Sequence, residues 1–380
     1  MSNIIKHVYI PAIKAHYPSG LEEMQGIADG AEVSLESVIL LNARYDLARL
    51  GDNSASQAPL VETNGIKTIQ DDSANECTSA VFLKGSTESG DVINAQNWDM
   101  SARLWLTDAV IYLEVHPDPS EHKPSMFFVT EAGQLGRSGM NSNGLGVTAN
   151  SLMSTDDYTP NPRDAQFKPV LPISLLRRMI LECDHFAEAL TAAQNFPRHV
   201  SNNLTIATTD GFGMCLEITP DRVYKVYCNI DDNYLIHTNH FTHKGFESRK
   251  DVLDRYPGGS SWFRRRRFEQ GIRSFKDGSL SNEKIINAFS DHLSHPESLC
   301  CHPDDNPVDA IIGNLPGYPF RSSSATVACV LYNLTQKTVT VCKGPPCQGT
   351  FQKFELKGQK ASREMKETTN GVKKSRPEIP

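Results

Sequence analysis

The chain has 380 residues, 39% of them hydrophobic, which is enough for one large core. Its formal net charge of −7 gives no basic footprint for nucleic acid or an anionic membrane, and it contains no run of about eighteen apolar residues that could span a bilayer. The N-terminus lacks the basic-then-apolar plan of a secretory signal, so we expect a cytoplasmic protein that acts on a small molecule or a peptide.

The first part of the chain has a helical pattern. Apolar residues recur near the helical period over residues 21–31 and 34–50, so we expect two helices there, with Gly30 ending the first. Residues 57–75 are largely polar, and we expect a loop that exposes the chain just before Cys77.

From Cys77 onward the pattern is that of short strands, with β-branched or alternating segments bounded by Gly, Pro and Asp. Strands are expected at residues 78–83, 92–98, 109–115, 125–130, 145–150, 204–208, 214–219, 222–227, 234–237, 325–332, 338–341 and 351–354. Helices are expected at residues 172–183, 186–194, 262–275 and 283–290. Strands followed by paired helices and strands again favour a layered α+β sandwich. Residues 357–380 have little apolar content, and we expect them to be disordered.

Cys77 opens the first of these strands and follows Glu76. If the bond between the two residues breaks, Cys77 carries a thiol and a free α-amine together. The α-amine has an unperturbed pKa of about 7.7 to 8.0, so it can accept the thiol proton and later return it to a leaving amine. A cysteine at a strand start is more often a small buried hydrophobe, so this motif needs support from elsewhere in the chain.

The support is a resemblance carried by several motifs in one order. They are Cys77-Thr78-Ser79-Ala80, Gln96-Asn97-Trp98-Asp99, Thr130-Glu131-Ala132-Gly133, Gly139-Met140-Asn141-Ser142 and His237-Thr238-Asn239-His240. Together they resemble the isopenicillin N acyltransferase family, the acyl-coenzyme A:6-aminopenicillanate acyltransferase-like branch of the N-terminal-nucleophile hydrolases. The resemblance implies a four-layer αββα sandwich with Cys77 beginning the central strand. It also implies a helical prosegment over residues 1–76 and a catalytic domain over residues 77–356.

The resemblance implies a role for each matching residue. Cys77 would attack the carbonyl of Glu76, and water would then release residues 1–76 as a small subunit. Asn239 matches the oxyanion asparagine, and Asp99 matches the aspartate that holds the new α-amine; the alternatives are a turn-capping asparagine and a turn aspartate. Arg44 lies where the family keeps an arginine on the prosegment helix, and we expect it to pair with a buried acid. Thr78 is a further processing candidate.

The implied activity is acyl transfer or amide hydrolysis through an acyl-enzyme. The substrate would be an acylated amine, a peptide or a β-lactam-like metabolite, and the setting would be secondary metabolism such as antibiotic biosynthesis. No cofactor is implied, although a coenzyme A thioester could be the acyl donor. A pure hydrolase, with water as the acceptor, is the closest alternative.

Three departures from the family pattern matter, and two of them, at Glu76 and at the N-terminus, support a different alternative: a catalytically inactive member that binds an acyl ligand or a partner. Glu76 stands where the family usually has glycine, and a bulky acid disfavours the strained scissile conformation. Ser322 and its serine neighbours occupy the place of the penicillin enzyme's arginine, with Arg321 two residues early. The family's most N-terminal segment also has no counterpart here. Retention of Cys77, Asp99 and Asn239 argues against this alternative.

Two clusters are given no functional role. The nine cysteines are an odd number without framework spacing, which suits reduced thiols; Cys300-Cys301-His302 and the pair Cys342 and Cys347 lack the spacing of zinc ligands, so we expect no metal site. The four arginines 264–267 point in different directions on a helix, and we expect a solvated face rather than a phosphate site.

Overall fold

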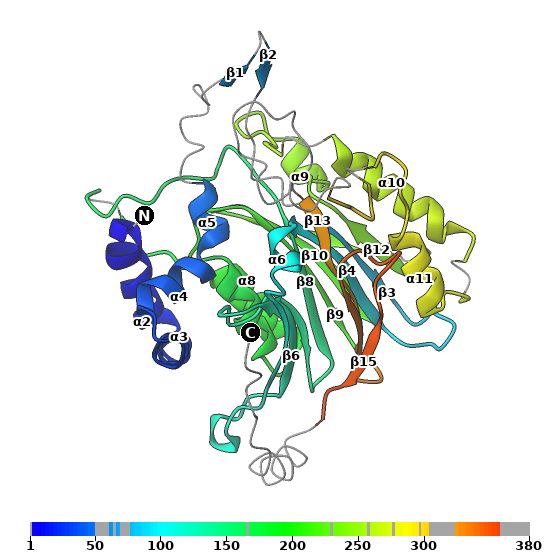
Figure 1. The fold of residues 1–380 in the computed structure, drawn as a ribbon, viewed down its shortest axis with the longest axis horizontal. Coiled ribbons are helices and arrows are strands. Elements are labelled where there is room, and N and C mark those ends of the chain that lie inside the picture. The colour runs from blue at the N-terminus through cyan, green and yellow to red at the C-terminus, as the bar shows by residue number, and fades with distance from the viewer. Residues whose placement is uncertain are drawn as a thin grey trace, which may run out of the picture.

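The computed structural model describes residues 2–49, 61–63, 66–68, 77–164, 167–228, 231–256, 259–275, 278–295, 298–303 and 324–357. Two antiparallel sheets lie face to face, and helices cover their outer faces (Figure 1). A separate pair of short strands is formed by β1 (Val61–Thr63) and β2 (Ile66–Thr68).

One sheet has seven strands. In order across the sheet they are β11 (Val223–Tyr227), β10 (Phe212–Ile218), β9 (Asn202–Thr208), β8 (Leu145–Ser151), β7 (Ser138–Asn141), β6 (Met126–Glu131) and β5 (Val110–Val115). The other sheet has six strands. They are β12 (Tyr234–His237), β3 (Cys77–Phe82), β4 (Ile93–Ser101), β13 (Ser324–Asn333), β14 (Thr338–Lys343) and β15 (Gln352–Glu355).

The helices fall into an N-terminal group and two later pairs. The N-terminal group is α1 (Ser2–Ile4), the π-helix η1 (Ile5–Tyr9), α2 (Ile10–His16), α3 (Pro18–Ala31), α4 (Leu35–Asn42) and α5 (Arg44–Ala48). The pairs are α7 (Ser174–Leu181) with α8 (Phe186–Asn195), and α10 (Ser260–Arg273) with α11 (Asn282–Phe289). Short helices are α6 (Arg103–Leu106), the 3-10 helix η3 (Pro119–Glu121) and α9 (Lys244–Glu247).

Three apolar clusters separate four layers. The first joins the N-terminal helices, α7 and α8 to the outer face of the seven-stranded sheet; the second lies between the sheets; and the third joins the six-stranded sheet to α10 and α11. Alternation along single strands produces this division. On β6, Phe128 faces the helices and Phe127 faces the other sheet. The layers are therefore helix, sheet, sheet, helix, which confirms the predicted αββα sandwich.

The observed elements depart from the predicted ones in three places. The helix predicted over residues 34–50 is two helices, because Ala43 leaves the helical conformation at φ −97° and ψ 4°. Gly30 does not end the preceding helix, which continues to Ala31 and is capped by Glu32 at φ 56°. Strand β7 was not predicted. A Cβ on its Gly139 would lie 2.4 Å from the backbone oxygen of Phe127, so the close strand contact there favours glycine.

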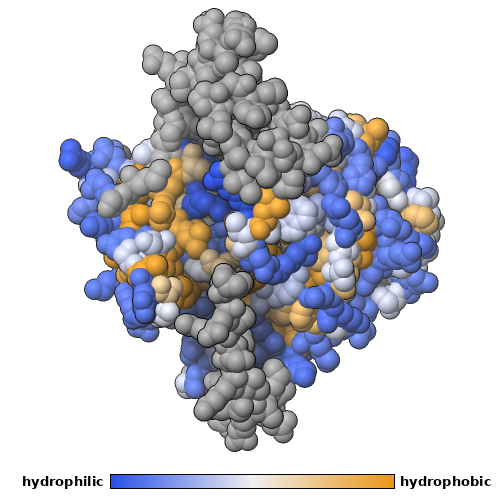
Figure 2. Space-filling view, in the orientation of Figure 1, coloured by the Kyte–Doolittle hydropathy of each residue, from blue (hydrophilic) through white to orange (hydrophobic). Residues whose placement is uncertain are grey.

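Two further expectations can be compared with this part of the chain. All nine cysteines are free thiols, as predicted for reduced cysteines. Among the helices that the structure describes, none has both the length and the apolar character needed to cross a bilayer. Figure 2 shows apolar residues gathered on the side of the molecule where the N-terminal helices lie.

Arg44 at the start of α5 joins the N-terminal helices to the seven-stranded sheet. Its two terminal nitrogens donate to both carboxylate oxygens of Glu131 on β6, at 2.7 and 2.6 Å. Glu131 is buried, so this pairing of Arg44 with a buried acid agrees with the prediction. A two-point contact of this kind fixes orientation as well as distance.

We expect Arg44→Leu to destabilise the fold by about 1–3 kcal/mol, because it leaves the buried carboxylate of Glu131 short of donors. The matched control is Lys6→Leu, since Lys6 and Glu36 form an exposed pair at 3.9 Å. We expect the control to change stability by less than about 0.5 kcal/mol. Urea unfolding at constant slope measures both values. Equal losses in the two variants would contradict a buried role for Arg44.

Candidate active site

Strand register brings the three predicted catalytic residues together. Cys77 is the first residue of β3 and lies opposite Trp98 on β4, directly before Asp99. On the other side of β3, Ser79 lies opposite His237, the last residue of β12, and Asn239 follows two residues later. The Cys77 side chain belongs to the cluster between the two sheets and is fully buried.

Asn239 holds the backbone nitrogen of Cys77. The Cys77 N–H donates to Oδ1 of Asn239 at 2.9 Å, and Nδ2 of Asn239 donates to the backbone oxygen of Ser151 at 3.0 Å. The amide oxygen of Asn239 therefore faces the nitrogen that would become the α-amine. The resemblance had given this position to Asp99 and the oxyanion role to Asn239, and both roles remain predictions.

Arg264 on α10 binds the first residues of β3 from the helix side of the six-stranded sheet. It donates from Nη1 to the backbone oxygen of Cys77 at 2.8 Å and to Oγ1 of Thr78 at 3.0 Å, and from Nη2 to Oδ1 of Asn239 at 2.8 Å. Its exposed fraction is 0%, so the predicted solvated face was wrong for this arginine. A sequence signal existed, because Arg264 shares the buried helical stripe of Ser261, Phe268 and Ile272.

The first turn of α10 also holds the segment after β12. Oγ of Ser261 accepts from the Asn239 N–H at 2.8 Å and lies 2.7 Å from Nδ1 of His240.

His237, the last residue of β12, pairs with a buried acid on β10. Its Nε2 lies 3.0 Å from Oε1 of Glu217. Burial lowers the pKa of His237, but Cys215 and Glu217 outweigh it and raise that pKa to about 10. This buried pair anchors β12 to the seven-stranded sheet.

Asp99 is held by a neighbouring strand. The hydroxyl of Thr326 on β13 donates to Oδ1 of Asp99 at 2.6 Å, and the N–H of Cys301 donates to the same hydroxyl oxygen at 3.0 Å. Asp99 is fully buried. The Thr326 hydroxyl thus orients the Asp99 carboxylate, and the N–H of Cys301, in the loop before β13, orients that hydroxyl.

Burial is the largest influence on the Cys77 thiol and raises its pKa. The positive charge of Arg137 lowers that pKa, the negative charge of Asp99 raises it, and Arg264 lowers it further. Arg137 is buried and lies over the ring of Trp98, 4.5 Å from its centroid. Sequence reasoning missed Arg137, which stands in no recognisable motif; only its position after the Thr130–Gly133 motif points towards the site.

A second buried arginine lies close to Arg137. Burial, followed by the charge of Arg137, lowers the pKa of Arg177 to about 9. The charge of Arg137, which lowers the pKa of the Cys77 thiol, makes the surroundings of Cys77 more positive.

Polar side chains between the sheets connect the site to the seven-stranded sheet. Ser79 donates to Oδ1 of Asn150 at 2.6 Å, and Nδ2 of Asn150 donates to the backbone oxygen of His237 at 2.9 Å. Gln96 donates to the same Asn150 oxygen at 3.1 Å. The amide of Asn150 is therefore engaged in structural contacts.

The chain matches, over residues 86–348, the family described as "Acyl-coenzyme A:6-aminopenicillanic acid acyl-transferase". The match covers well over half of the sequence and includes Asp99, Asn239 and Arg264, although it begins after Cys77. This chain belongs to that family. The resemblance predicted from the motifs is confirmed.

Similar proteins come from a fungus and from bacteria. The chain is 26% identical over 288 residues to the "Acyl-coenzyme A:6-aminopenicillanic-acid-acyltransferase 40 kDa form" of Emericella nidulans, covering 76% of this chain and 68% of the relative. A conjugated bile acid hydrolase of Clostridium perfringens superposes with a TM-score of 0.48 at 12% identity, covering 74% of this chain and 92% of the hydrolase. Penicillin V acylase of Agrobacterium tumefaciens superposes with a TM-score of 0.42 at 14% identity, covering 70% and 83%.

Not every predicted site residue of this family member can be placed. Glu76, Arg321 and Ser322 lie outside the described residues. Thr78 lies beside Cys77 and is bound by Arg264, whereas Arg44 reaches the site only through Glu131. The bounds predicted for the prosegment and the tail fall partly on undescribed residues and remain predictions.

A hollow of about 580 Å³ lies elsewhere in the described part of the molecule. Its lining includes Asp91, just before β4, and Lys353 on β15. Asp99 lies near the other end of β4, so this hollow is separated from Cys77 by the length of the strand. It contains no cysteine, and we do not place the active site there.

We expect Arg264→Met to destabilise the protein by at least about 3 kcal/mol, because hydrogen bonds to a charged group are lost from several buried acceptors at once. The matched control is Arg266→Met, two positions along α10, where the arginine is exposed and pairs with Glu269. We expect a change of less than about 0.5 kcal/mol in the control. Urea unfolding compares the variants, and a control as damaging as Arg264→Met would contradict the assignment.

The charges around Cys77 predict opposite shifts in its titration. Asp99→Asn removes a charge that raises the thiol pKa, so the midpoint should move to lower pH; Arg137→Met removes a charge that lowers it, so the midpoint should move to higher pH. The measurement is thiolate ultraviolet absorbance against pH, after subtracting the same titration of Cys77→Ala. The two variants are compared in the same processing state. Shifts in the same direction would reject this electrostatic account.

Proposed function

We propose that this protein is an autoprocessed acyltransferase or amide hydrolase whose nucleophile is the thiol of Cys77. The observation that carries the proposal is the set of hydrogen bonds that hold the backbone of Cys77 at the start of β3. Asn239 accepts from its backbone nitrogen, and Arg264 donates to its backbone oxygen and to the same Asn239 oxygen. Membership of an acyl-transferase family supports this assignment.

The first reaction is cleavage before Cys77. The thiol of Cys77 is fully buried, and the carbonyl of the preceding peptide bond is joined to it through the chain, so this reaction needs no substrate to enter the site. The sulfur bonds to the carbonyl carbon of Glu76, the carbon–nitrogen bond breaks, and the thiol proton passes to the new amine. Water then hydrolyses the thioester, so that Glu76 ends in a carboxylate and Cys77 has a free thiol.

Turnover repeats this chemistry on a substrate. The α-amine of Cys77, bound by Oδ1 of Asn239, accepts the thiol proton, and the sulfur attacks an acyl carbonyl. The bond from that carbon to the substrate's own amine or thiol then breaks, and the α-ammonium gives the proton to this leaving group. A nearby donor stabilises the oxyanion, and such a donor contributes about 3–4 kcal/mol to the barrier reduction. The amide nitrogen of Asn239 is our proposed donor, and Asp99 orients the amine. The acyl group then passes to an amine or to water, which distinguishes a transferase from a hydrolase.

The cleaved prosegment is proposed to stay bound as a small subunit. Residues from the N-terminal helices are part of the first apolar cluster, among them Tyr9, Ile13, Met24 and Ile39, all fully buried. Separating these helices from the sheet would expose this surface to water, at a cost of about 25 cal/mol per Å² of apolar area. The Arg44 to Glu131 contact would break as well.

The substrate is proposed to be an acylated amine, a peptide or a β-lactam-like metabolite that carries a carboxylate. The buried positive groups of Arg137 and Arg177 beside Cys77 support the carboxylate, because arginine binds carboxylates through two parallel hydrogen bonds. The name of the Emericella nidulans relative, an acyl-coenzyme A:6-aminopenicillanic-acid-acyltransferase, supports an acyl-coenzyme A donor, and a role in secondary metabolism is part of this proposal. No resident cofactor is needed for this chemistry.

Intact mass spectrometry of the purified protein beside Cys77→Ala tests the nucleophile. We expect fragments 1–76 and 77–380 from the parent and one full-length chain from the variant. The matched control is Cys183→Ser, because Cys183 is also a free thiol but lies outside the site. It should be cleaved like the parent. Cleavage of Cys77→Ala at the same bond would exclude Cys77.

Acyl amides and acyl thioesters are then offered to the mature protein, with and without an acceptor amine. Transfer to the amine identifies a transferase, and release of the free acid alone identifies a hydrolase. An uncut parent that binds an acyl ligand without turnover would overturn the proposal in favour of the inactive, ligand-binding alternative.

A further inference from the structure

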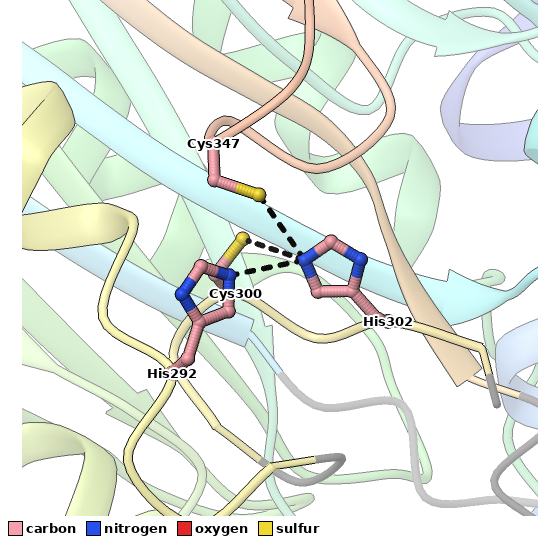
Figure 3. A group of neighbouring side chains, drawn as sticks. All are labelled: His292, Cys300, His302 and Cys347. Carbon is pink, nitrogen blue, oxygen red and sulfur yellow. Dashed lines mark hydrogen bonds between the residues drawn. The ribbon is translucent and has the colours of Figure 1, made fainter. Parts of the chain in front are cut away.

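Four metal-ligating side chains meet at the end of the six-stranded sheet, outside the site of Cys77. They are His292, Cys300, His302 and Cys347, and their ligand atoms all lie within 4.8 Å of one another. His292 follows α11, Cys300 and His302 precede β13, and Cys347 stands between β14 and β15. Figure 3 shows the other three side chains pointing at one ring nitrogen of His302.

The contacts at that nitrogen exceed what hydrogen bonding can satisfy. Nε2 of His302 lies 3.1 Å from Nε2 of His292, 3.4 Å from Sγ of Cys300 and 3.2 Å from Sγ of Cys347. A ring nitrogen carries either one N–H or one lone pair, directed along one line in the ring plane. It can serve one of these partners well, whereas a cation between them would serve all four.

The spacing fits a tetrahedral zinc ion. With bonds of about 2.3 Å to sulfur and about 2.0 to 2.1 Å to nitrogen, the edges of a tetrahedron are roughly 3.3 Å between nitrogens and roughly 3.6 Å between nitrogen and sulfur. The observed separations of 3.1, 3.4 and 3.2 Å are shorter by at most about 0.4 Å. Small side-chain rotations would admit the ion without moving the strands.

We propose that these four residues bind a structural zinc ion. Two thiolates and two imidazoles are the donors of Cys2His2 zinc sites, whereas calcium and magnesium require oxygen ligands. All four positions would be filled by protein, so the ion has no open position for catalysis. Cys347 and His292 are exposed, which gives a metal ion a path from solvent. The side-chain amide of Gln348 lies 3.1 Å from Nδ1 of His302; with Nε2 on the metal that nitrogen carries the ring proton, and the amide would orient the ring by presenting its oxygen as the acceptor.

The ion would join three segments that are far apart in sequence and fix the loop behind Asp99. Cys301, next to the ligand Cys300, donates its N–H to Thr326, whose hydroxyl donates to Asp99. Nδ2 of Asn97 on β4 donates to the backbone oxygen of Leu299 at 2.9 Å. The same loop is therefore attached both to β4, which carries Asp99, and to β13, which pairs with it, and the metal would hold the outer side of the loop.

The sequence predicted no zinc site because residues close together in the chain do not supply four ligands. Cys300-Cys301-His302 offers two ligands, and Cys347 is 45 positions after His302. His292 was not considered at all. The fold supplies the missing proximity, since β13 and β14 pair and return the chain to the same end of the sheet.

Metal analysis of the full chain tests the site. After dialysis with a mild chelator, the parent should retain roughly one zinc per chain, and Cys300→Ser, Cys347→Ser and His292→Ala should each bind zinc at least about tenfold more weakly. The matched controls are Cys183→Ser and His295→Ala; His295 packs against the ring of His302 but is not one of the four ligands. Both controls should keep the metal.

Cobalt substitution of the parent gives a second readout that does not depend on how a variant folds. Tetrahedral thiolate coordination predicts intense visible d–d bands and a sulfur-to-cobalt charge-transfer band, both abolished by added zinc. A parent that binds neither metal would overturn the proposal. The proposal would also be overturned by a parent that contains a disulfide between Cys300 and Cys347, which lowers its intact mass by two hydrogens.

Discussion

The buried guanidinium group of Arg264 is the contact on which the geometry of the site depends. It connects three oxygen atoms from β3 and from the segment after β12: the backbone oxygen of Cys77, Oγ1 of Thr78 and Oδ1 of Asn239. Burying a charge costs several kcal/mol unless its hydrogen bonds are made. Because only this arrangement supplies those acceptors, the charge makes displacement of β3, β12 or α10 unfavourable.

The direction of the Cys77 side chain follows from the same contact. Side chains alternate along β3, so Cys77 and Val81 lie between the sheets while Ala80 and Phe82 face α10 and α11. A slip of one residue would turn the thiol towards the helices. Arg264 binds Thr78, which lies on the helix side, and thereby fixes the register at the first residue of the strand. The contacts on the helix side of β3 thus determine which of its side chains face the other sheet.

Local patterns predicted most of the fold, and the reasons for success and failure differ by element. Strand β12 was predicted at its observed bounds because Tyr234 to His237 is a compact apolar run. Strand β7 has Ser138 and Gly139 in place of β-branched residues, and it is a strand because it pairs with β6 on one side and β8 on the other. The fold class followed from the order of the elements and from the family motifs.

The site could be predicted only where it is carried by motifs. Cys77, Asp99 and Asn239 were named from their motifs, and strand register places them together. Arg264 was misjudged because its three arginine neighbours suggested a surface. Local patterns could not predict the role of Arg137 or the cluster of His292, Cys300, His302 and Cys347. Only the tertiary structure brings Arg137 near Cys77 and the four cluster residues near one another.

The N-terminal helices contribute to the site from a distance, and this bears on why a cleaved prosegment would be kept. Asn42 on α4 donates to the backbone oxygen of Gly133 at 3.1 Å and accepts from the N–H of Leu135 at 3.1 Å. These contacts fix the loop that carries Arg137, the positive charge that lowers the pKa of the Cys77 thiol most. Losing the helices would release that loop and weaken the charge that favours the thiolate. If the proposed cleavage takes place, the N-terminal helices would therefore have a reason to remain bound, because they keep the electrostatic surroundings of the Cys77 thiol in place.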